Sequence, residues 1–189
     1  MRGACAILLA IGVLAAAPAM AESNIGFKAI EGRVGFVDIG EGDAGGTFIV
    51  SAFADLGMLS ENIGLEAGVD FWSKGWDAGV CEWSWTNIGF VGDATYGFGS
   101  GDGSVRPYGF AGIALAMQSW DWDCNYVGPY YNDSSFDDSS MEFGFNFGVG
   151  AEFGSGDGMT PVARAGYNTN GGADYLYIQG GLRFPMGGN

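Results

Sequence analysis

Apolar residues alternate with small or polar residues along much of this chain. The clearest run is residues 141–153, in which every odd position is apolar and every even position is Gly, Asn or Glu. Residues 63–71 and 175–184 repeat the pattern. Because successive side chains of a strand point to opposite faces, a period of two indicates strands with one apolar face. Weaker alternation predicts five further strands, at residues 30–37, 47–56, 85–98, 105–117 and 160–167.

The second face of these predicted strands is mostly glycine with a few charges, which suits a narrow barrel interior better than a surface in water. The apolar face is nearly free of charge, as a face in contact with lipid must be. We therefore predict an all-β fold, an eight-stranded antiparallel up-and-down transmembrane β-barrel. The alternative is a soluble lipocalin-like barrel, in which the apolar face would point inward.

The first residues have the features of a secretory signal peptide. Arg2 supplies a positive charge, residues 7–17 are apolar, and Ala19-Met20-Ala21 is a small-x-small cleavage pattern. The apolar run is shorter than the roughly 20 residues that a membrane-spanning helix needs. We expect residues 1–21 to be removed and residues 22–189 to form the barrel domain, so that the mature protein is exported. No later segment is suited to a transmembrane helix, so any insertion must use strands.

Composition and charge exclude several functions. The chain has 22 Asp and Glu against 7 Lys and Arg, a formal net charge of −15, which argues against binding nucleic acid. It contains no histidine, which removes Ser-His-Asp and Cys-His catalysis and histidine-ligated zinc. No pair of carboxylates has a spacing that defines a catalytic dyad. We expect no enzyme activity, no cofactor and no dedicated metal site.

Two turns and one long connection are expected between the strands. Residues 98–103 and 153–158 have the same sequence, Phe-Gly-Ser-Gly-Asp-Gly, and are interpreted as tight hairpin turns. A calcium or phosphate loop is the alternative, but the spacing of an EF-hand and the lysine of a P-loop are both missing. Residues 121–140 form the longest irregular segment. Short turns on one rim and long loops on the other place the termini and the tight turns in the periplasm.

Three short motifs carry a resemblance to a known group of proteins. Arg106-Pro107-Tyr108, followed by Gly109 and Gly112, resembles a strand motif of the OmpA-like and opacity-type outer-membrane β-barrel families. Residues 145–153 are similar to the next strand of those barrels. Residues 177–184, with Leu182 and Phe184, resemble their C-terminal insertion signal.

The resemblance implies a location in the cell outer membrane of a Gram-negative envelope. It implies contact with outer-membrane lipid and lipopolysaccharide, and recognition of the last strand by the barrel-insertion machinery. Two departures stand. Residues 185–189 follow the final aromatic residue, where such barrels usually end, and no C-terminal peptidoglycan-binding domain is expected.

The six tryptophans fall in or beside two predicted outer loops. We favour an aromatic girdle at the membrane interface, where amphipathic rings prefer to lie. The alternative is an outer rim that binds an aromatic, sugar or hydrophobic ligand outside the cell. The residues are Trp72, Trp76, Trp83, Trp85, Trp120 and Trp122.

Acidic residues crowd the same two loops, where they could bind divalent cations weakly. We favour a simpler role, a charged and solvated loop that resists aggregation. The residues are Asp77, Glu82, Asp121, Asp123, Asp133, Asp137 and Asp138.

Two cysteines remain once Cys5 leaves with the signal peptide. An even number in an exported chain indicates a disulfide, here between Cys81 and Cys124 in two neighbouring outer loops. Closing about 40 residues contributes roughly 3–4 kcal/mol in the chain-entropy model. Two free thiols are the alternative.

Strand parity places several charges on the inner face, toward the periplasmic end. An eight-stranded barrel is only wide enough for side chains to fill it, and confined charges must pair. We therefore expect an arginine–carboxylate network that closes the lower lumen, with a hydrated channel lined by the same charges as the alternative. The arginines are Arg33, Arg106, Arg164 and Arg183, and the carboxylates are Glu31, Asp55, Glu66, Asp93 and Glu152.

These observations predict an integral outer-membrane barrel with a structural or surface-binding role and a plugged lumen. The alternative within the membrane is a small porin or a channel for hydrophobic solutes. The sequence does not identify an extracellular ligand.

Overall fold

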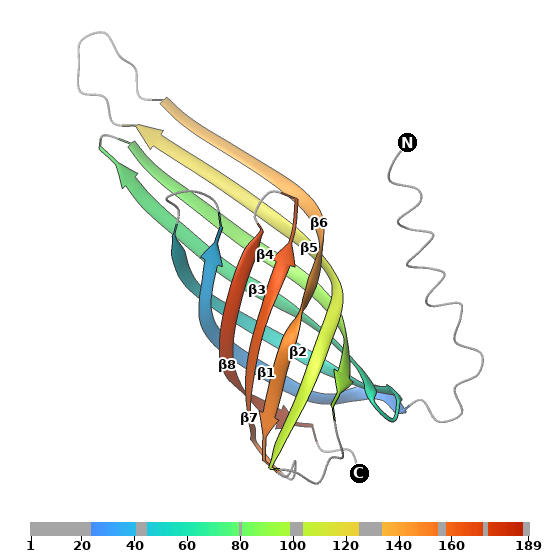
Figure 1. Cartoon of the computed structure of the whole chain (residues 1–189). Coiled ribbons are helices and arrows are strands. Elements are labelled where there is room, and N and C mark those ends of the chain that lie inside the picture. The colour runs from blue at the N-terminus through green and yellow to red at the C-terminus, as the bar shows by residue number, and fades with distance from the viewer. Residues whose placement is uncertain are drawn as a thin grey trace, which may run out of the picture.

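The eight expected strands form a closed antiparallel ring. The computed structural model describes residues 24–40, 45–79, 81–98, 104–124, 134–154, 158–171 and 174–186. Within these ranges, no helix is long and apolar enough to cross a membrane. The predicted fold class is confirmed (Figure 1). The strands are β1 (Asn24–Ile39), β2 (Gly46–Ser60), β3 (Ile63–Ala78), β4 (Cys81–Gly97), β5 (Val105–Cys124), β6 (Ser134–Phe153), β7 (Thr160–Thr169) and β8 (Tyr175–Pro185).

Several expectations lie outside the described residues. They are the signal peptide at residues 1–21, residues 99–103 and 155–157 of the two predicted hairpin turns, and Asp133.

Every strand pairs with its neighbours in the chain, and β8 closes the ring against β1. The closing pair runs from Ala29 opposite Pro185 to Ile39 opposite Tyr175. The backbone N–H of Met186 then donates to the carbonyl of Lys28, 2.8 Å away. The start of β1 and the end of β8 therefore lie at the same end of the barrel.

The apolar face predicted from the alternation points outward. Phe143, Phe145, Phe147 and Val149 of β6 are all exposed, while Asn146 between them is buried. Because the barrel turns its apolar residues out and its polar ones in, the outer surface is suited to lipid. The soluble lipocalin-like alternative, which requires the opposite arrangement, is wrong.

Glycine occupies inner positions where neighbouring backbones approach closely. A Cβ atom on Gly35 would lie 1.9 Å from the carbonyl oxygen of Ile178, and one on Gly144 would lie 1.3 Å from that of Thr169. Both distances are far below contact, so no larger residue fits without moving the backbone. This accounts for glycine on the polar face of the predicted strands.

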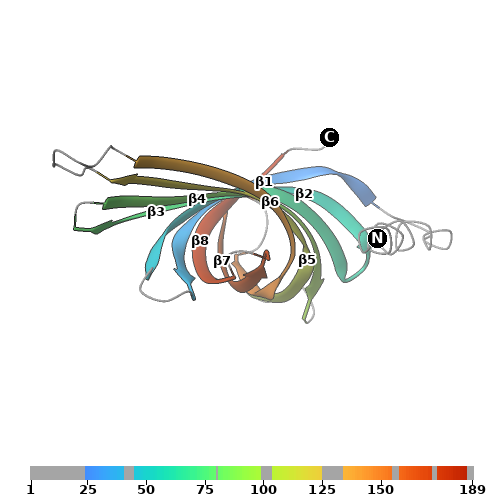
Figure 2. The ribbon, with the colours of Figure 1, turned by 90° about the horizontal axis from the view of Figure 1, so that it is seen from above.

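Four strands continue past the ring. β2 pairs with β3 only as far as Trp72, and β7 pairs with β6 only from Phe145 onward. Beyond those points β3, β4, β5 and β6 pair only with each other, and they project to one side of the barrel (Figures 1 and 2). We call this four-stranded sheet the extension: residues 73–78, 81–87, 118–124 and 134–144.

The extension corrects the two predicted outer loops. Residues 72–78 and 81–84 belong to β3 and β4, and residues 121–124 and 134–140 belong to β5 and β6. These residues resemble loops in the sequence because the apolar and polar faces of the strands exchange places beyond the barrel.

The polarity of the outer face changes at a single row of the sheet. Phe71, Ile88, Met117 and Met141 are direct cross-strand neighbours and are the last apolar residues on this face. The next outer row is Ser73, Thr86, Ser119 and Ser139, and acidic residues follow. A lipid-facing surface must be apolar and a surface in water need not be, so this row marks the limit of the lipid-facing belt.

Candidate functional site

Two buried arginines lie inside the barrel and share one carboxylate. Arg33 of β1 and Arg164 of β7 are each 2% exposed. Nη2 of Arg33 lies 2.8 Å from Oε2 of Glu66, and Nη1 of Arg164 lies 2.8 Å from Oε1 of the same residue. Arg33 also pairs with Glu31, and Arg164 with Asp93. Glu66 belongs to β3, so these contacts link β3 across the lumen to β1 and β7, the two neighbours of β8.

A second cluster lies nearer the end of the barrel that carries the start of β1. Glu152 of β6 pairs with two arginines, Arg106, whose Nη2 lies 2.8 Å from Oε2 of Glu152, and Arg183. Arg183 also pairs with Asp55 of β2. The side chains of Arg106 and Arg183 are 38% and 29% exposed, so this cluster is in contact with solvent.

The two clusters together take a charged residue from every strand. The structure brings each residue predicted for the lumen network into an ion pair: Arg33, Arg106, Arg164, Arg183, Glu31, Asp55, Glu66, Asp93 and Glu152.

Aromatic rings cover the two buried guanidinium groups. The central carbon of Arg33 lies 4.2 Å from the ring centre of Phe53, and that of Arg164 lies 3.4 Å from the ring centre of Phe110. A guanidinium group is planar and weakly hydrated, so an aromatic face stabilises it where water is excluded. These rings also fill space beside the ion pairs.

Amides and a phenol extend the network along the lumen. The side-chain amide of Asn146 donates to both carboxylate oxygens of Asp93, at 3.1 and 3.0 Å, and the hydroxyl of Tyr177 donates to Asn146 at 2.9 Å. Gln118 donates to Oδ1 of Asn170 at 3.1 Å. Each of these polar groups replaces bonds to water that burial removes.

Asp70 is a buried lumen carboxylate that the sequence analysis did not assign to the network. It is 3% exposed and stands on the inner face of β3, two inner positions along from Glu66. None of the ion pairs among the described residues includes it. The signal was present, because Asp70 is on the polar face of the alternating run at residues 63–71.

A compact apolar layer lies above the polar residues, toward the extension. Trp72 packs edge-on against Trp85 and Tyr175, with ring centres 5.2 and 5.8 Å apart. Val37, Ile39 and Ile49 belong to the same buried cluster, which continues to Phe110 and Tyr177 beside the charged residues. We call Trp72, Trp85, Tyr175 and the three aliphatic residues the aromatic layer. Charged and apolar side chains therefore occupy successive levels of the lumen.

The aromatic girdle expected from the tryptophans is wrong for Trp72 and Trp85. They are 0% and 1% exposed and face the lumen. The other four, Trp76, Trp83, Trp120 and Trp122, follow the same strand parity and lie on the inner face of the extension. A girdle requires rings on the outer, lipid-facing side, and strand parity turns all six the other way.

Three of these rings form a continuous stack across the extension. Trp83 lies between Trp76 and Trp122, with ring centres 6.1 and 5.1 Å apart and planes within 4° and 13° of parallel. In the row below, Trp85 and Trp120 stack with centres 3.8 Å apart. Direct cross-strand pairing on one face of the sheet produces both contacts.

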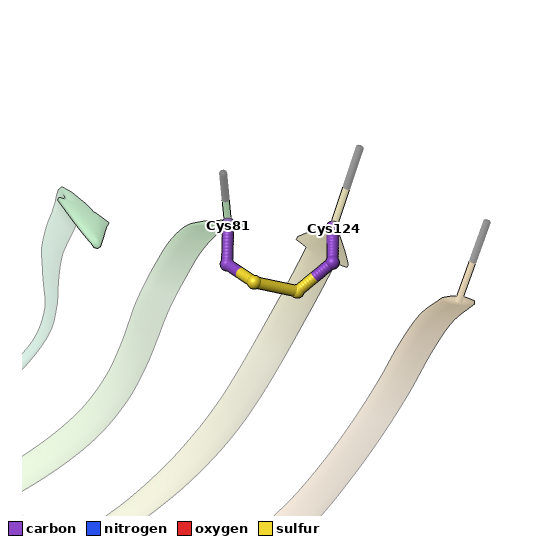
Figure 3. The surroundings of a disulfide bond; sticks show 2 residues. All are labelled: Cys81 and Cys124. Carbon is purple, nitrogen blue, oxygen red and sulfur yellow. A yellow bond between two sulfur atoms is a disulfide. The ribbon is translucent and has the colours of Figure 1, made fainter. Parts of the chain in front are cut away.

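A disulfide joins the outer ends of β4 and β5, as expected (Figure 3). Cys81 and Cys124 are cross-strand partners with Cα atoms 4.1 Å apart and a sequence separation of 43. The prediction that they lie in loops is wrong, because both are terminal residues of strands. The bond lies next to the row of Trp83 and Trp122.

The disulfide predicts a simple thiol count. If residues 1–21 are removed with Cys5, as the sequence predicts, protein purified from outer membranes and denatured without reductant should show no reactive thiol, and two after reduction. The count uses a thiol-specific dye under denaturing conditions. Two reactive groups before reduction would contradict the bond.

The acidic residues of the extension do not gather into a metal site. No group of three Asp, Glu, His or Cys side chains among the described residues is placed to hold a metal ion. Asp77, Glu82 and Asp123 form one row on the outer face, opposite to the tryptophans. Asp121 accepts a hydrogen bond from Ser84 at 3.1 Å. Asp138 lies on the inner face beside Trp120, and only the backbone of Asp137 is described.

A cavity of about 310 Å³ opens at the end of the barrel where β1 begins. Arg106, Arg183 and Glu152 line it together with Tyr108 and Glu66. The cavity therefore ends at the two ion-pair clusters.

The closed ring, its apolar belt and its polar lumen define a transmembrane β-barrel of the outer-membrane type. The sequence matches the family described as outer membrane protein beta-barrel domain over residues 6–187, and the chain belongs to this family. It is therefore an outer-membrane protein, and the predicted family resemblance is confirmed. None of the curated proteins compared with the sequence matched it.

Solved structures share the fold at low sequence identity. Neisserial surface protein A is 15% identical, with a TM-score of 0.58 over 84% of this chain and 97% of that one. A major outer membrane protein from Thermus thermophilus is 12% identical, with a TM-score of 0.60 over 84% and 99%. The N-terminal β-barrel domain of Pseudomonas aeruginosa OprF is 16% identical, with a TM-score of 0.51 over 86% and 100%. These likenesses show the architecture alone.

Proposed function

We propose that this protein is a structural or surface-binding outer-membrane barrel whose lumen is closed to solutes. The single observation that carries the proposal is the ion-pair network, to which every strand contributes a charged residue. The sequence has no histidine, and the role we propose is non-catalytic.

The arrangement of the lumen supports closure at two levels. Arg164 and Glu66 bridge the lumen in the charged level, and Trp72 and Trp85 fill it in the aromatic layer. A solute would have to separate buried ion pairs and then displace packed rings, and each step carries a large energetic cost.

The second candidate is a small porin or a channel for hydrophobic solutes. The cavity beside Arg106 and Arg183 favours it, because such a recess resembles a channel mouth. The two candidates differ in one measurable property, the conductance of the folded protein.

Planar-bilayer recording is expected to show no large, stable conductance from the wild type. Arg164→Ala and Trp85→Ala should each remain closed, because the other level still fills the lumen. The double variant removes one side chain from each level and should conduct. Val149→Ala, which changes only the outer face, is the matched control and should behave like the wild type.

One conductance result would contradict the closed lumen. A large wild-type conductance that is unchanged by Arg106→Ala or Glu152→Ala would rule out a closed lumen and establish the porin.

A further inference from the structure

The inner face of the extension is a tryptophan surface with no partner strand opposite it among the described residues. We call Trp76, Trp83, Trp120 and Trp122 the tryptophan platform. All four are only partly buried, unlike the lumen-facing Trp72 and Trp85. The neighbouring strands do not extend to this level, because β2 pairs with β3 only as far as Trp72 and β7 pairs with β6 only from Phe145 onward.

The backbone of the extension also lacks a described partner strand at both of its edges. Residues 134–144 of β6 pair with β5 alone, and residues 73–78 of β3 pair with β4 alone. An exposed strand edge is a template for an added extended segment. The platform therefore lies on a sheet that can accept a further strand.

The charge of the extension is strongly negative. Its described strands contain seven acidic residues and one basic residue, Lys74. The Lys74 ammonium donates to the carbonyl oxygen of Gly46 at 3.0 Å, which directs it toward β2. On the inner face, Asp138 stands directly across from Trp120 in the ladder, and Glu142 lies two inner positions away on β6.

We propose that the tryptophan platform binds an extended, arginine-containing segment of a partner protein. Tryptophan presents the most favourable aromatic face to a cation, and a guanidinium group stacks on it while pairing with a carboxylate. Trp120 and Asp138 place these two groups side by side. A polyanionic ligand is disfavoured by the net charge of −15.

An extended segment fits better than a single small cation. The stacked rings cross three neighbouring strands, and Asp138 and Glu142 continue the same inner face on the fourth strand, β6. Several basic side chains at two-residue spacing would meet successive rows of the sheet. This assignment deepens the surface-binding role proposed above and rests on it.

The test measures binding of a nona-arginine peptide to the full folded protein in detergent. Tryptophan fluorescence reports binding at about 0.15 M salt, where screening confines charge effects to roughly 8 Å. Trp83→Ala is expected to weaken binding about tenfold, because it removes the central ring of the stack. Nona-lysine should bind more weakly than nona-arginine.

A pair of aspartate variants separates the platform from diffuse charge. Asp138→Asn changes the inner face and Asp77→Asn changes the outer face by the same charge, and both residues are exposed. We expect the loss of affinity to be several-fold larger for Asp138→Asn. The unboiled gel mobility of each variant verifies that the barrel is folded.

Four results would overturn the proposal. Equal losses in the two aspartate variants would mean nonspecific attraction. An unchanged affinity in folded Trp83→Ala would exclude the platform. If tetramethylammonium displaced the peptide and bound as tightly as the peptide does, the platform would be a site for a small cation. If a neutral oligosaccharide bound more tightly than the peptide, the platform would be a glycan site. The conductance measurement is independent of the binding measurement. A barrel that conducts and also binds the peptide would contradict the closed lumen and still support this binding site.

Discussion

Arg164→Met is expected to reduce the free energy of unfolding by about 3–5 kcal/mol, the usual effect of breaking a buried ion pair by removing one partner. Arg164 is the cation between Glu66 and Asp93, and the side chains of Arg164 and Asp93 are both 0% exposed. Without it, the Asp93 carboxylate stays buried, and the amide of Asn146 is its one remaining side-chain donor among the described residues. Urea unfolding in lipid vesicles, followed by tryptophan fluorescence, measures the change.

Arg106→Met is the matched control. The Arg106 side chain is 38% exposed, and its partner Glu152 keeps Arg183 when Arg106 is removed. We expect a loss below about 1 kcal/mol, as for ion pairs in contact with water. A second variant, Arg164→Met with Asp93→Asn, should recover part of the stability because it removes both charges. Equal losses in the two single variants would contradict a network whose stability depends on burial.

Phe147→Arg is expected to destabilise the inserted barrel by about 2–4 kcal/mol, the cost of an arginine at the bilayer midplane. Phe147 is exposed in the middle of the apolar belt of β6, between Phe145 and Val149. The charge would face hydrocarbon instead of water. Unfolding in vesicles and the fraction of protein that keeps its folded gel mobility both report the effect.

Val105→Arg provides the comparison at the end of the belt. Val105 is the first residue of β5 and is also exposed. Close to the interface the same substitution costs only about 0–1 kcal/mol. If both variants were equally stable, Phe147 would not face lipid.

The barrel itself was predictable because its signal is local. The run at residues 141–153 fixes which side of β6 meets lipid, and the runs at residues 63–71 and 175–184 do the same for β3 and β8. Strand parity also assigned Arg33, Arg164 and Glu66 to the inner face before any partner was known. Asp70 follows the same parity but was not assigned to the network.

The extension was not predicted because its apolar and polar faces are exchanged relative to those of the barrel. The alternation of side chains between the inner and outer faces continues unchanged. Trp72 and Trp76 continue the inner face of β3, yet the pattern of apolar and polar residues reverses after Phe71. Within the membrane the outer face must be apolar. Beyond it the outer face meets water, so the tryptophans lie on the inner face and five of the seven acidic residues lie on the outer face. Tryptophans alternating with polar residues were the available signal, and their interpretation as loops concealed it.

The sequence by itself determined the strand faces, the inward charges and the candidate cysteine pair, because each depends on the period of two or on a residue count. Only the tertiary structure decided which charges meet. Glu66 contacts Arg33 and Arg164, which are 33 and 98 residues away in the chain, because closure of the ring and its register bring β1, β3 and β7 together. The same register aligns Trp76, Trp83 and Trp122 into one stack. Parity is a property of a single strand, whereas register belongs to the assembled sheet, and no single strand specifies it.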